Sequence, residues 1–157
     1  MSLLKNEVEL LRRVPLFSGI EASKLKLLAY TSDAVTYRDG QVLFRKGDPG
    51  DAAYVIVGGQ AEVTVTTDAG DIPVAQLKDG DFVGEIAILC DIPRTATVTA
   101  RSELKTLRIS KDRFLELMKQ FPEMAIEMTR TLANRLNHTT TELVQAQREI
   151  ANAAGHG

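Results

Sequence analysis

Hydrophobic positions follow helical spacing at both ends of the chain and strand-like spacing in the middle. Near the N-terminus, Leu4, Val8 and Leu11 recur at intervals of four and three, which predicts an amphipathic helix. A second helix is expected over residues 22–30. After residue 30 the pattern shortens, and glycines separate the apolar runs.

Short runs rich in β-branched and aromatic residues predict strands where turn residues bound them. The Gly58-Gly59 pair and the stretch 68–71, which contains Gly70, are hairpin signals between such runs. We therefore expect an antiparallel meander in this region. Its strands are predicted at residues 34–37, 41–44, 53–57, 61–67 and 72–77.

The period of the pattern changes again after residue 94. Residues 95–100 alternate Thr with small apolar side chains, which predicts a half-buried strand, and another strand is expected at 104–109. Ser110 is a candidate N-cap for a helix that Pro122 interrupts. A longer helix is expected from about residue 123 to about residue 151, because that stretch contains no Gly or Pro.

Helices at both ends of about eight short strands predict a mainly β fold with flanking α-helices. We expect an eight-stranded antiparallel β-roll, similar to a jelly roll or cupin-like barrel, with N-terminal helices and a C-terminal helix pair. The 157 residues have the length of one domain, and the sequence contains no internal repeat or long linker. We therefore expect a single domain over 1–157, with the β-roll at 14–109 and the C-terminal helices at 111–151.

Composition narrows the function classes. Lys and Arg number 19 against 21 Asp and Glu, so binding of nucleic acid through bulk charge is not expected. Cys90 is the only cysteine, which excludes an internal disulfide and Cys-rich metal sites, and we expect it to be a small buried residue. The sequence has neither a secretory signal nor an apolar run of membrane-spanning length. These features predict a cytoplasmic protein that makes no membrane contact.

Residues with catalytic potential are few. His138 and His156 cannot by themselves build a metal-dependent phosphodiesterase site. The GDPGD sequence at 47–51 offers carboxylates, but Asp-Pro-Gly sequences favour tight turns, and we interpret it as a turn. We expect neither an enzyme nor a bound metal or cofactor.

The clearest binding chemistry lies in residues 82–97. Gly84 and Glu85 are expected to open a short helical turn, where free amides attract anions and glycine permits close approach of a ligand. Arg94 begins the next strand and offers a two-pronged donor for a phosphate, while Glu85 can accept from a sugar hydroxyl. A ligand with one phosphate beside one free ribose hydroxyl would satisfy these groups.

The run GEIAILCDIPRTATV at 84–98 resembles the phosphate-binding cassette of the cyclic nucleotide-binding domain family, which includes Crp/Fnr-type regulators and regulatory domains of kinases and channels. The stretches VPLFSGI and FRKGDPGDAAYVIVGGQAEV and the closing helices are also similar to the family pattern, so the resemblance covers about residues 14–150. It implies that Glu85 binds the ribose 2′-hydroxyl and Arg94 the cyclic phosphate.

The resemblance further implies that main-chain amides at four cassette positions complete the oxygen shell, namely Gly84, Ala87, Thr95 and Ala96. The Thr95 hydroxyl is compatible with cAMP and cGMP, of which we expect cAMP more. The implied ligand-binding residues are Phe82, Val83, Gly84, Glu85, Ile86, Ala87, Arg94, Thr95, Ala96, Thr139 and Thr140.

LANRLNHTTTELV resembles the helix of Crp-like regulators in which hydroxyl residues from two subunits meet the adenine, here Thr139 and Thr140. An apolar stripe along this helix either covers the β-roll or forms a seam with a second copy. The resemblance favours a homodimer. The stripe consists of Leu132, Leu136, Thr139, Leu143, Ala146 and Ile150.

The resemblance implies a stand-alone receptor module that binds a cyclic nucleotide, shifts its C-terminal helix and signals to an unknown downstream protein. Because the chain ends at Gly157, we expect no helix-turn-helix domain and no direct DNA binding. One alternative is a Crp/Fnr-type transcription regulator, or its sensory piece, that acts on DNA through a partner or a missing domain. Another is an interaction module that has lost its ligand, against which Glu85 and Arg94 argue.

Overall fold

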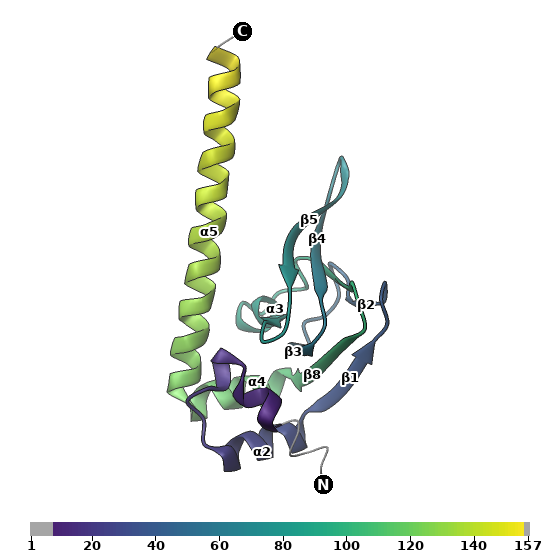
Figure 1. Cartoon of the computed structure of the whole chain (residues 1–157), viewed down its shortest axis with the longest axis vertical. Coiled ribbons are helices and arrows are strands. Elements are labelled where there is room, and N and C mark those ends of the chain that lie inside the picture. Colours follow the sequence, from purple (N-terminus) through teal and green to yellow (C-terminus); the bar gives the residue numbers. More distant parts are fainter. Residues whose placement is uncertain (1–7, 156–157) are drawn as a thin grey trace.

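Two four-stranded antiparallel sheets face each other in the computed structural model, which describes residues 8–155 (Figure 1). The first sheet has the order β1-β8-β3-β6 and the second the order β2-β7-β4-β5. This architecture confirms the predicted eight-stranded β-roll. The strands are β1 (Asp33–Tyr37), β2 (Val42–Phe44), β3 (Ala52–Gly58), β4 (Ala61–Thr67), β5 (Gly70–Leu77), β6 (Phe82–Val83), β7 (Thr97–Ala100) and β8 (Leu104–Ser110).

The connections between strands differ from the predicted meander. β4 and β5 form a hairpin around Gly70, as expected. β3, however, pairs with β6 and β8 in the first sheet, whereas β4 lies in the second. The prediction of a hairpin at Gly58-Gly59 was therefore wrong. Gly59 adopts φ +108° and packs against the Glu103 backbone, so this pair carries the chain closely across from one sheet to the other.

Strand β3 separates two apolar cores because its successive side chains point to opposite faces. Val55 packs with Leu107 in a core between the first sheet and the helices. Its neighbour Ile56 packs with Val98 and Leu104 inside the roll. The helical side of the first core includes Leu11, Phe17, Leu25, Leu28, Phe114, Leu117, Met124 and Met128.

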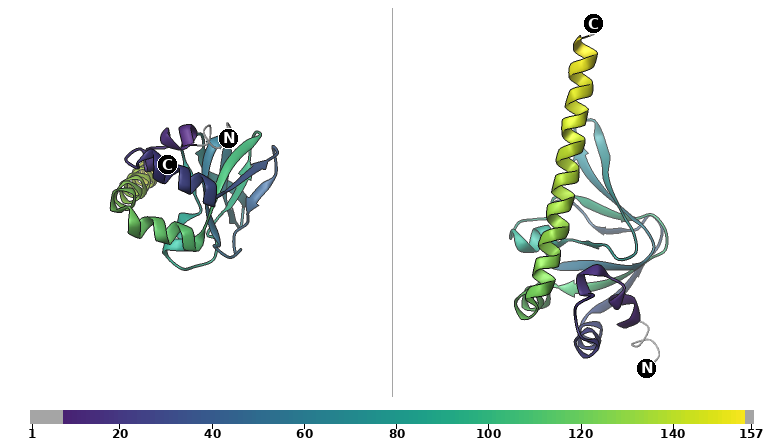
Figure 2. Two further views of the ribbon diagram at one scale, coloured as in Figure 1. Left: turned by 90° about the horizontal axis from the view of Figure 1, so that it is seen from below. Right: turned by 60° about the vertical axis from the view of Figure 1, so that its left-hand side comes forward.

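The helices enclose the first core at one end of the roll (Figure 2). Residues 8–12 are helical, while Leu4 of the predicted N-terminal helix lies outside the described residues. Ser110 caps α4 as predicted, since its hydroxyl accepts from the Arg113 amide. The remaining elements are the 3₁₀ helix η1 (Pro15–Phe17), α2 (Ala22–Thr31), α3 (Glu85–Leu89), α4 (Lys111–Gln120) and α5 (Pro122–Gly155).

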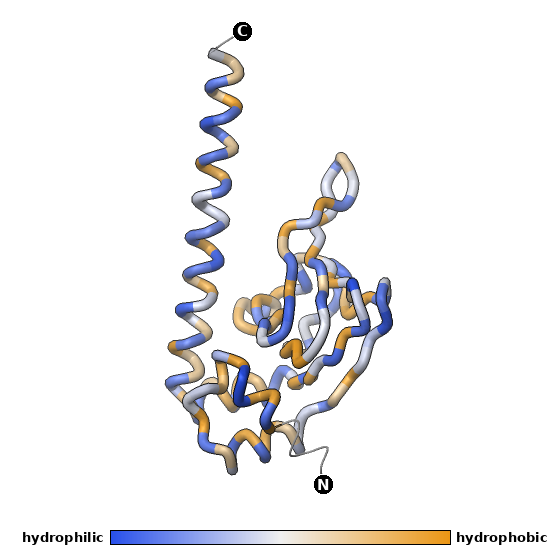
Figure 3. Tube along the Cα trace, viewed as in Figure 1, coloured by the Kyte–Doolittle hydropathy of each residue, from blue (hydrophilic) through white to orange (hydrophobic). Residues whose placement is uncertain are grey.

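Helix α5 packs on the core only through its first turns, where Met124 and Met128 are buried. Beyond them it projects past the roll, and hydrophobic bands continue along its length (Figure 3). Leu136, Leu143 and Ile150 are 69%, 58% and 69% exposed. The interpretation of the stripe as a cover for the β-roll was therefore wrong for this part of the helix. Across residues 8–155, no helix is long and apolar enough to cross a membrane.

Candidate functional site

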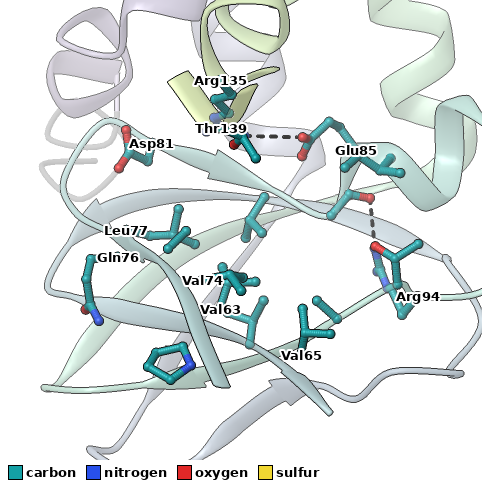
Figure 4. Close-up of a pocket in the computed structure, with 18 of the residues that line it drawn as sticks. Val63, Val65, Val74, Gln76, Leu77, Asp81, Glu85, Arg94, Arg135 and Thr139 are labelled. Atoms are coloured by element: carbon teal, nitrogen blue, oxygen red, sulfur yellow. Dashed lines mark hydrogen bonds and ion pairs between the residues drawn. The ribbon is translucent and has the colours of Figure 1, made fainter. Parts of the chain in front are cut away.

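A cavity of about 950 Å³ lies between the cassette, the β4–β5 hairpin and α5 (Figure 4). Glu85 and Arg94 stand at the cassette side, and Arg135 and Thr139 project from α5. The hairpin supplies an apolar wall that consists of Val63, Val65, Val74 and Leu77. The volume falls within the range of small-molecule sites, and the mixed lining suits a ligand with a polar end and a flat apolar part.

Gly84 allows the cassette backbone to approach Arg94 closely. Its φ of +94° belongs to the left-handed region, and a Cβ atom there would lie 2.8 Å from Arg94 Nη1 and 3.1 Å from the Ala52 carbonyl oxygen. Any side chain at this position would displace the guanidinium. The glycine that sequence analysis assigned to ligand approach therefore also shapes the place of Arg94.

Arg94 is 3% exposed and its guanidinium is held on several sides. Nη1 donates to the Gly84 carbonyl at 2.8 Å and Nη2 to the Ala52 carbonyl at 2.6 Å, and the group lies 4.0 Å from the centre of the Phe44 ring. Burial lowers the pKa of Arg94, and the charges of neighbouring groups, including Asp51, oppose this shift. Among residues 8–155, the buried Nε atom finds no hydrogen-bond partner.

Glu85 is 2% exposed at the first position of α3. Burial raises the pKa of this carboxyl, an effect that its own backbone amide, Arg135 and Arg94 oppose. Oε1 accepts from Arg135 Nη1 at 3.3 Å. Oε2 is buried and has no hydrogen-bond partner within the described part of the chain. Glu85 thus keeps one free acceptor atom close to the cavity.

Arg135 is a site residue that sequence analysis missed. Besides its ion pair with Glu85, its Nη2 donates to the Phe82 carbonyl at 3.1 Å, and its guanidinium lies 4.7 Å from the centre of the Phe82 ring. It joins α5 to the cassette. The available signal was its spacing, because Arg135 precedes Thr139 by four residues and so shares one helix face with it.

The remaining predicted residues are placed unevenly around the cavity. Thr139 lines it together with eight predicted cassette residues, whereas Thr140 is exposed and lies outside its lining. Phe82 contributes beneath Arg135 rather than in the lining itself. The predicted residues that line the cavity are Val83, Gly84, Glu85, Ile86, Ala87, Arg94, Thr95, Ala96 and Thr139.

Cys90 is exposed, so the expectation of a buried cysteine was wrong. It follows the last residue of α3, and that helix turns Ala87 and Ile88 inward instead. His138 pairs with Glu142 one helical turn away, with Nε2 and Oε1 2.9 Å apart. Nowhere in the described chain do three or more His, Cys, Asp or Glu side chains gather as they would around a metal ion.

The GDPGD sequence forms a turn, as predicted, and also supports Arg94. The Gly47 amide donates to the Arg94 carbonyl at 2.9 Å, and the Arg94 amide donates to the Asp48 carbonyl at 2.8 Å. Asp51 is the last residue of this stretch, with Oδ1 3.6 Å from Arg94 Nη2 and Oδ2 3.1 Å from Arg108 Nη2. Interpreting the stretch only as a turn left out these ion pairs.

Comparison with known proteins gives this geometry a context. The chain is 36% identical to the cAMP-dependent protein kinase regulatory subunit of Dictyostelium discoideum over 82% of its own length and 41% of that protein. It is 28% identical to the CRP-like cAMP-activated global transcriptional regulator of Mycobacterium tuberculosis over 86% of its length and 61% of that protein. The chain thus spans less than two thirds of each of these curated relatives.

Solved structures and a family profile agree with these sequence relatives. The catabolite activator protein of Thermus thermophilus superposes with a TM-score of 0.73 and 28% identity, over 82% of this chain and 61% of that one. The profile described as cyclic nucleotide-binding domain matches residues 34–121, which is more than half of the chain and includes the whole cassette. The chain belongs to the cyclic nucleotide-binding domain family.

Proposed function

We propose that this domain is a receptor for cAMP and works as a regulatory module rather than as an enzyme. One observation carries the proposal: of the three buried side-chain polar atoms without a hydrogen-bond partner in the described structure, two, Arg94 Nε and Glu85 Oε2, belong to the residues to which the cassette motif assigns phosphate and ribose. Leaving a buried polar atom unpaired costs about 1 to 3 kcal/mol. A ligand that satisfies both atoms removes this cost.

A cyclic nucleotide has the groups that the two atoms need. Its phosphate carries one negative charge and accepts from Arg94, whose other nitrogens are already fixed by carbonyls. Its ribose keeps a free 2′-hydroxyl that donates to Glu85. The base then extends toward the apolar wall of the hairpin, where Val63 and Val74 offer a surface for a flat ring.

The choice of cAMP over cGMP has support from the relatives, since both proteins compared above carry cAMP in their names. Thr95 lies at the cavity, where its hydroxyl can contact either base. We propose cAMP as the preferred ligand and cGMP as a weaker one.

Ligand binding acts on α5 through Glu85. In the structure, Arg135 of α5 occupies one oxygen of this carboxylate and the other is free. A ribose hydroxyl on the same carboxylate changes the strength of the Arg135 contact and so favours one position of the helix. The ligand thereby alters the surface that α5 presents to a downstream protein.

The exposed part of α5 suits a second copy of the chain. Leu136, Leu143 and Ile150 follow a seven-residue spacing on one face of the helix, which is the pattern of a two-stranded coiled coil. Thr140 lies outside the lining of its own cavity and would reach the cavity of a partner across such a seam. We propose a homodimer in which both subunits contribute to each nucleotide site.

Two classes of downstream partner fit the relatives. The similarity to kinase regulatory subunits favours a protein kinase catalytic subunit as the downstream partner. The match to the transcription regulator covers 86% of this chain, which favours a signal passed to DNA through a further domain or partner. Each of these signals would start from the same nucleotide site.

Isothermal titration calorimetry tests the proposed ligand, because the absence of Trp removes the usual fluorescence signal. The chain should bind cAMP more tightly than cGMP. Binding of 2′-deoxy-cAMP should be about 10- to 150-fold weaker, the value of one hydrogen bond to a charged acceptor in a dry site. Absence of binding by every cyclic nucleotide would contradict the function, and equal affinity for the 2′-deoxy ligand would contradict the role of Glu85.

A further inference from the structure

Asp51 lies between Arg94 and Arg108 and contacts Arg108 more closely. Its Oδ2 is hydrogen-bonded to Arg108 Nη2 at 3.1 Å, whereas its Oδ1 stays 3.6 Å from Arg94 Nη2, which is beyond direct hydrogen-bond range. The carboxylate is therefore turned toward Arg108. Its charge still faces the buried Arg94 guanidinium at the distance of an ion pair.

Arg108 is itself fixed by the sheet. It stands on β8 in register with Asp33 of β1 and Tyr54 of β3, the strands on either side. Its Nη1 lies 3.7 Å from the Asp33 carboxylate. A side chain that is paired with Asp33 of the neighbouring strand can keep Asp51 in one orientation at a low cost in side-chain entropy.

We infer that Arg108 is a positioning residue for Arg94, and that it acts by holding the Asp51 carboxylate back from the guanidinium that receives the phosphate. This inference rests on the proposed binding of a cyclic nucleotide. Arg108 makes no contact with the ligand in this scheme. It determines how much of the Arg94 charge remains available to the ligand.

The physical reason is competition between two anions for one cation. Without Arg108, Arg94 is the only cation within 4 Å of Asp51 among the described ion pairs. The freed carboxylate would then close on Arg94 and place a second negative charge beside the incoming phosphate. Both effects weaken phosphate binding.

The same geometry predicts a small effect on folding. Asp51 is 66% exposed and Arg108 is 28% exposed, so their ion pair is partly screened by water and contributes little to stability. Loss of Arg108 should therefore weaken nucleotide binding measurably while leaving the unfolding temperature almost unchanged. This separation distinguishes a positioning role from a structural one.

The test is a double-mutant cycle with calorimetric titration of cAMP, on wild type, Arg108→Gln, Asp51→Asn and the double variant. Arg108→Gln should weaken binding about 3- to 10-fold, whereas in the Asp51→Asn background it should change affinity by less than about twofold. Arg101→Gln is the matched control, because Arg101 forms an ion pair with Glu62, at an N–O distance of 3.0 Å, that does not involve Arg94. Arg108→Lys should recover part of the loss.

Several outcomes overturn the inference while leaving the proposed function intact. In the first, the wild type binds cAMP and the affinity of Arg108→Gln lies within about twofold of the wild-type value. In the second, Arg108→Gln lowers the cAMP affinity equally with and without the Asp51 carboxylate. A loss that Arg101→Gln reproduces overturns it as well. Failure of the wild-type chain to bind any cyclic nucleotide refutes the proposed function itself.

Discussion

The cassette and the distal part of α5 differ sharply in how their side chains are held. In the cassette, Glu85 and Arg94 are only 2% and 3% exposed, and the backbone carbonyls of Gly84 and Ala52 fix the guanidinium. On α5, Leu136 and Leu143 are 69% and 58% exposed. One region is complete within a single chain, while the other presents apolar side chains to water.

This difference separates two tasks of the proposed receptor. The phosphate end of the site is preformed, so its affinity should depend on a few buried residues. The base end depends on where α5 lies, and Arg135 alone ties this helix to Glu85 among the ion pairs of the described residues. Changes of the buried cassette residues should therefore weaken binding most, whereas changes on α5 should alter assembly and response.

Replacement of Arg94 by Leu should have the largest effect, a loss of about 2 to 5 kcal/mol in nucleotide binding, because the phosphate would be enclosed without its cation. Calorimetry with cAMP measures the loss, and circular dichroism checks the fold. Arg94→Lys is the control: it keeps the charge but not the fork or the Nε atom, and should bind with intermediate affinity. Wild-type affinity in Arg94→Leu would show that the phosphate lies elsewhere.

Leu143→Asp should act on assembly first. If α5 forms a seam between two copies, the change buries an unpaired charge in each and should raise the dissociation constant of the dimer about 100-fold or more. Gln145→Asp adds the same charge off the stripe and should leave the dimer intact. Analytical ultracentrifugation with and without cAMP measures both. A wild-type chain that stays monomeric at every concentration would refute the dimer.

Arg135→Ala should affect both regions at once. It removes the partner of a buried carboxylate oxygen, and because Arg135 itself is 37% exposed we expect a loss of about 1 to 2 kcal/mol in the free energy of unfolding. Arg130→Ala breaks an exposed ion pair with Glu127 on the same helix and serves as the control. Urea unfolding measures both. A similar loss of unfolding free energy in the two variants would show that the contact of Arg135 with the cassette does not stabilise the fold more than an exposed ion pair does.

Much of the fold followed from the sequence, since alternation and turn residues are local signals. The strand predicted at 61–67 coincides with β4, and the Ser110 cap is present. The Gly58-Gly59 prediction failed because a glycine pair signals a sharp change of direction but not which strands pair afterwards. That choice depends on long-range packing of β3 against β8, which lies about fifty residues further along the chain.

The site could be predicted as far as its motif extends. Residues 84–96 lie close together in sequence, so their spacing carries the geometry. Asp51 and Arg108 approach Arg94 only through the sheet, and Arg135 arrives from a separate helix. Nothing local marks Asp51 or Arg108 as neighbours of Arg94, because an isolated charge on a strand or helix usually faces solvent. Arg135 shows only its spacing of four residues from Thr139. Tertiary structure was needed to connect them with the cassette.

Glu85→Gln should change how stability depends on pH. Burial raises the pKa of Glu85 in the folded chain above its pKa in the unfolded chain. The contribution of Glu85 to stability is therefore greatest at pH values below the unfolded-state pKa, and it is lost as the pH rises through the folded-state pKa. Glu85→Gln should therefore gain stability relative to wild type as the pH rises above about 4.5, as measured by urea unfolding at a series of pH values. Glu62→Gln should show the opposite trend, because hydrogen bonds from Gln76 and Arg101 lower the pKa of Glu62.

Thr95→Ala tests the boundary between the two regions with the smallest effect. Thr95 lies in the cassette and lines the cavity, and its hydroxyl is expected to contribute more to cGMP than to cAMP. Its loss should shift the preference toward cAMP by about 0.5 to 1.5 kcal/mol, the value of one hydrogen bond. Titration of one preparation with both ligands gives the ratio, in which any change of folding cancels. If the ratio is unchanged, the hydroxyl makes no contact with the base, and selection between the two nucleotides lies with α5 and the hairpin.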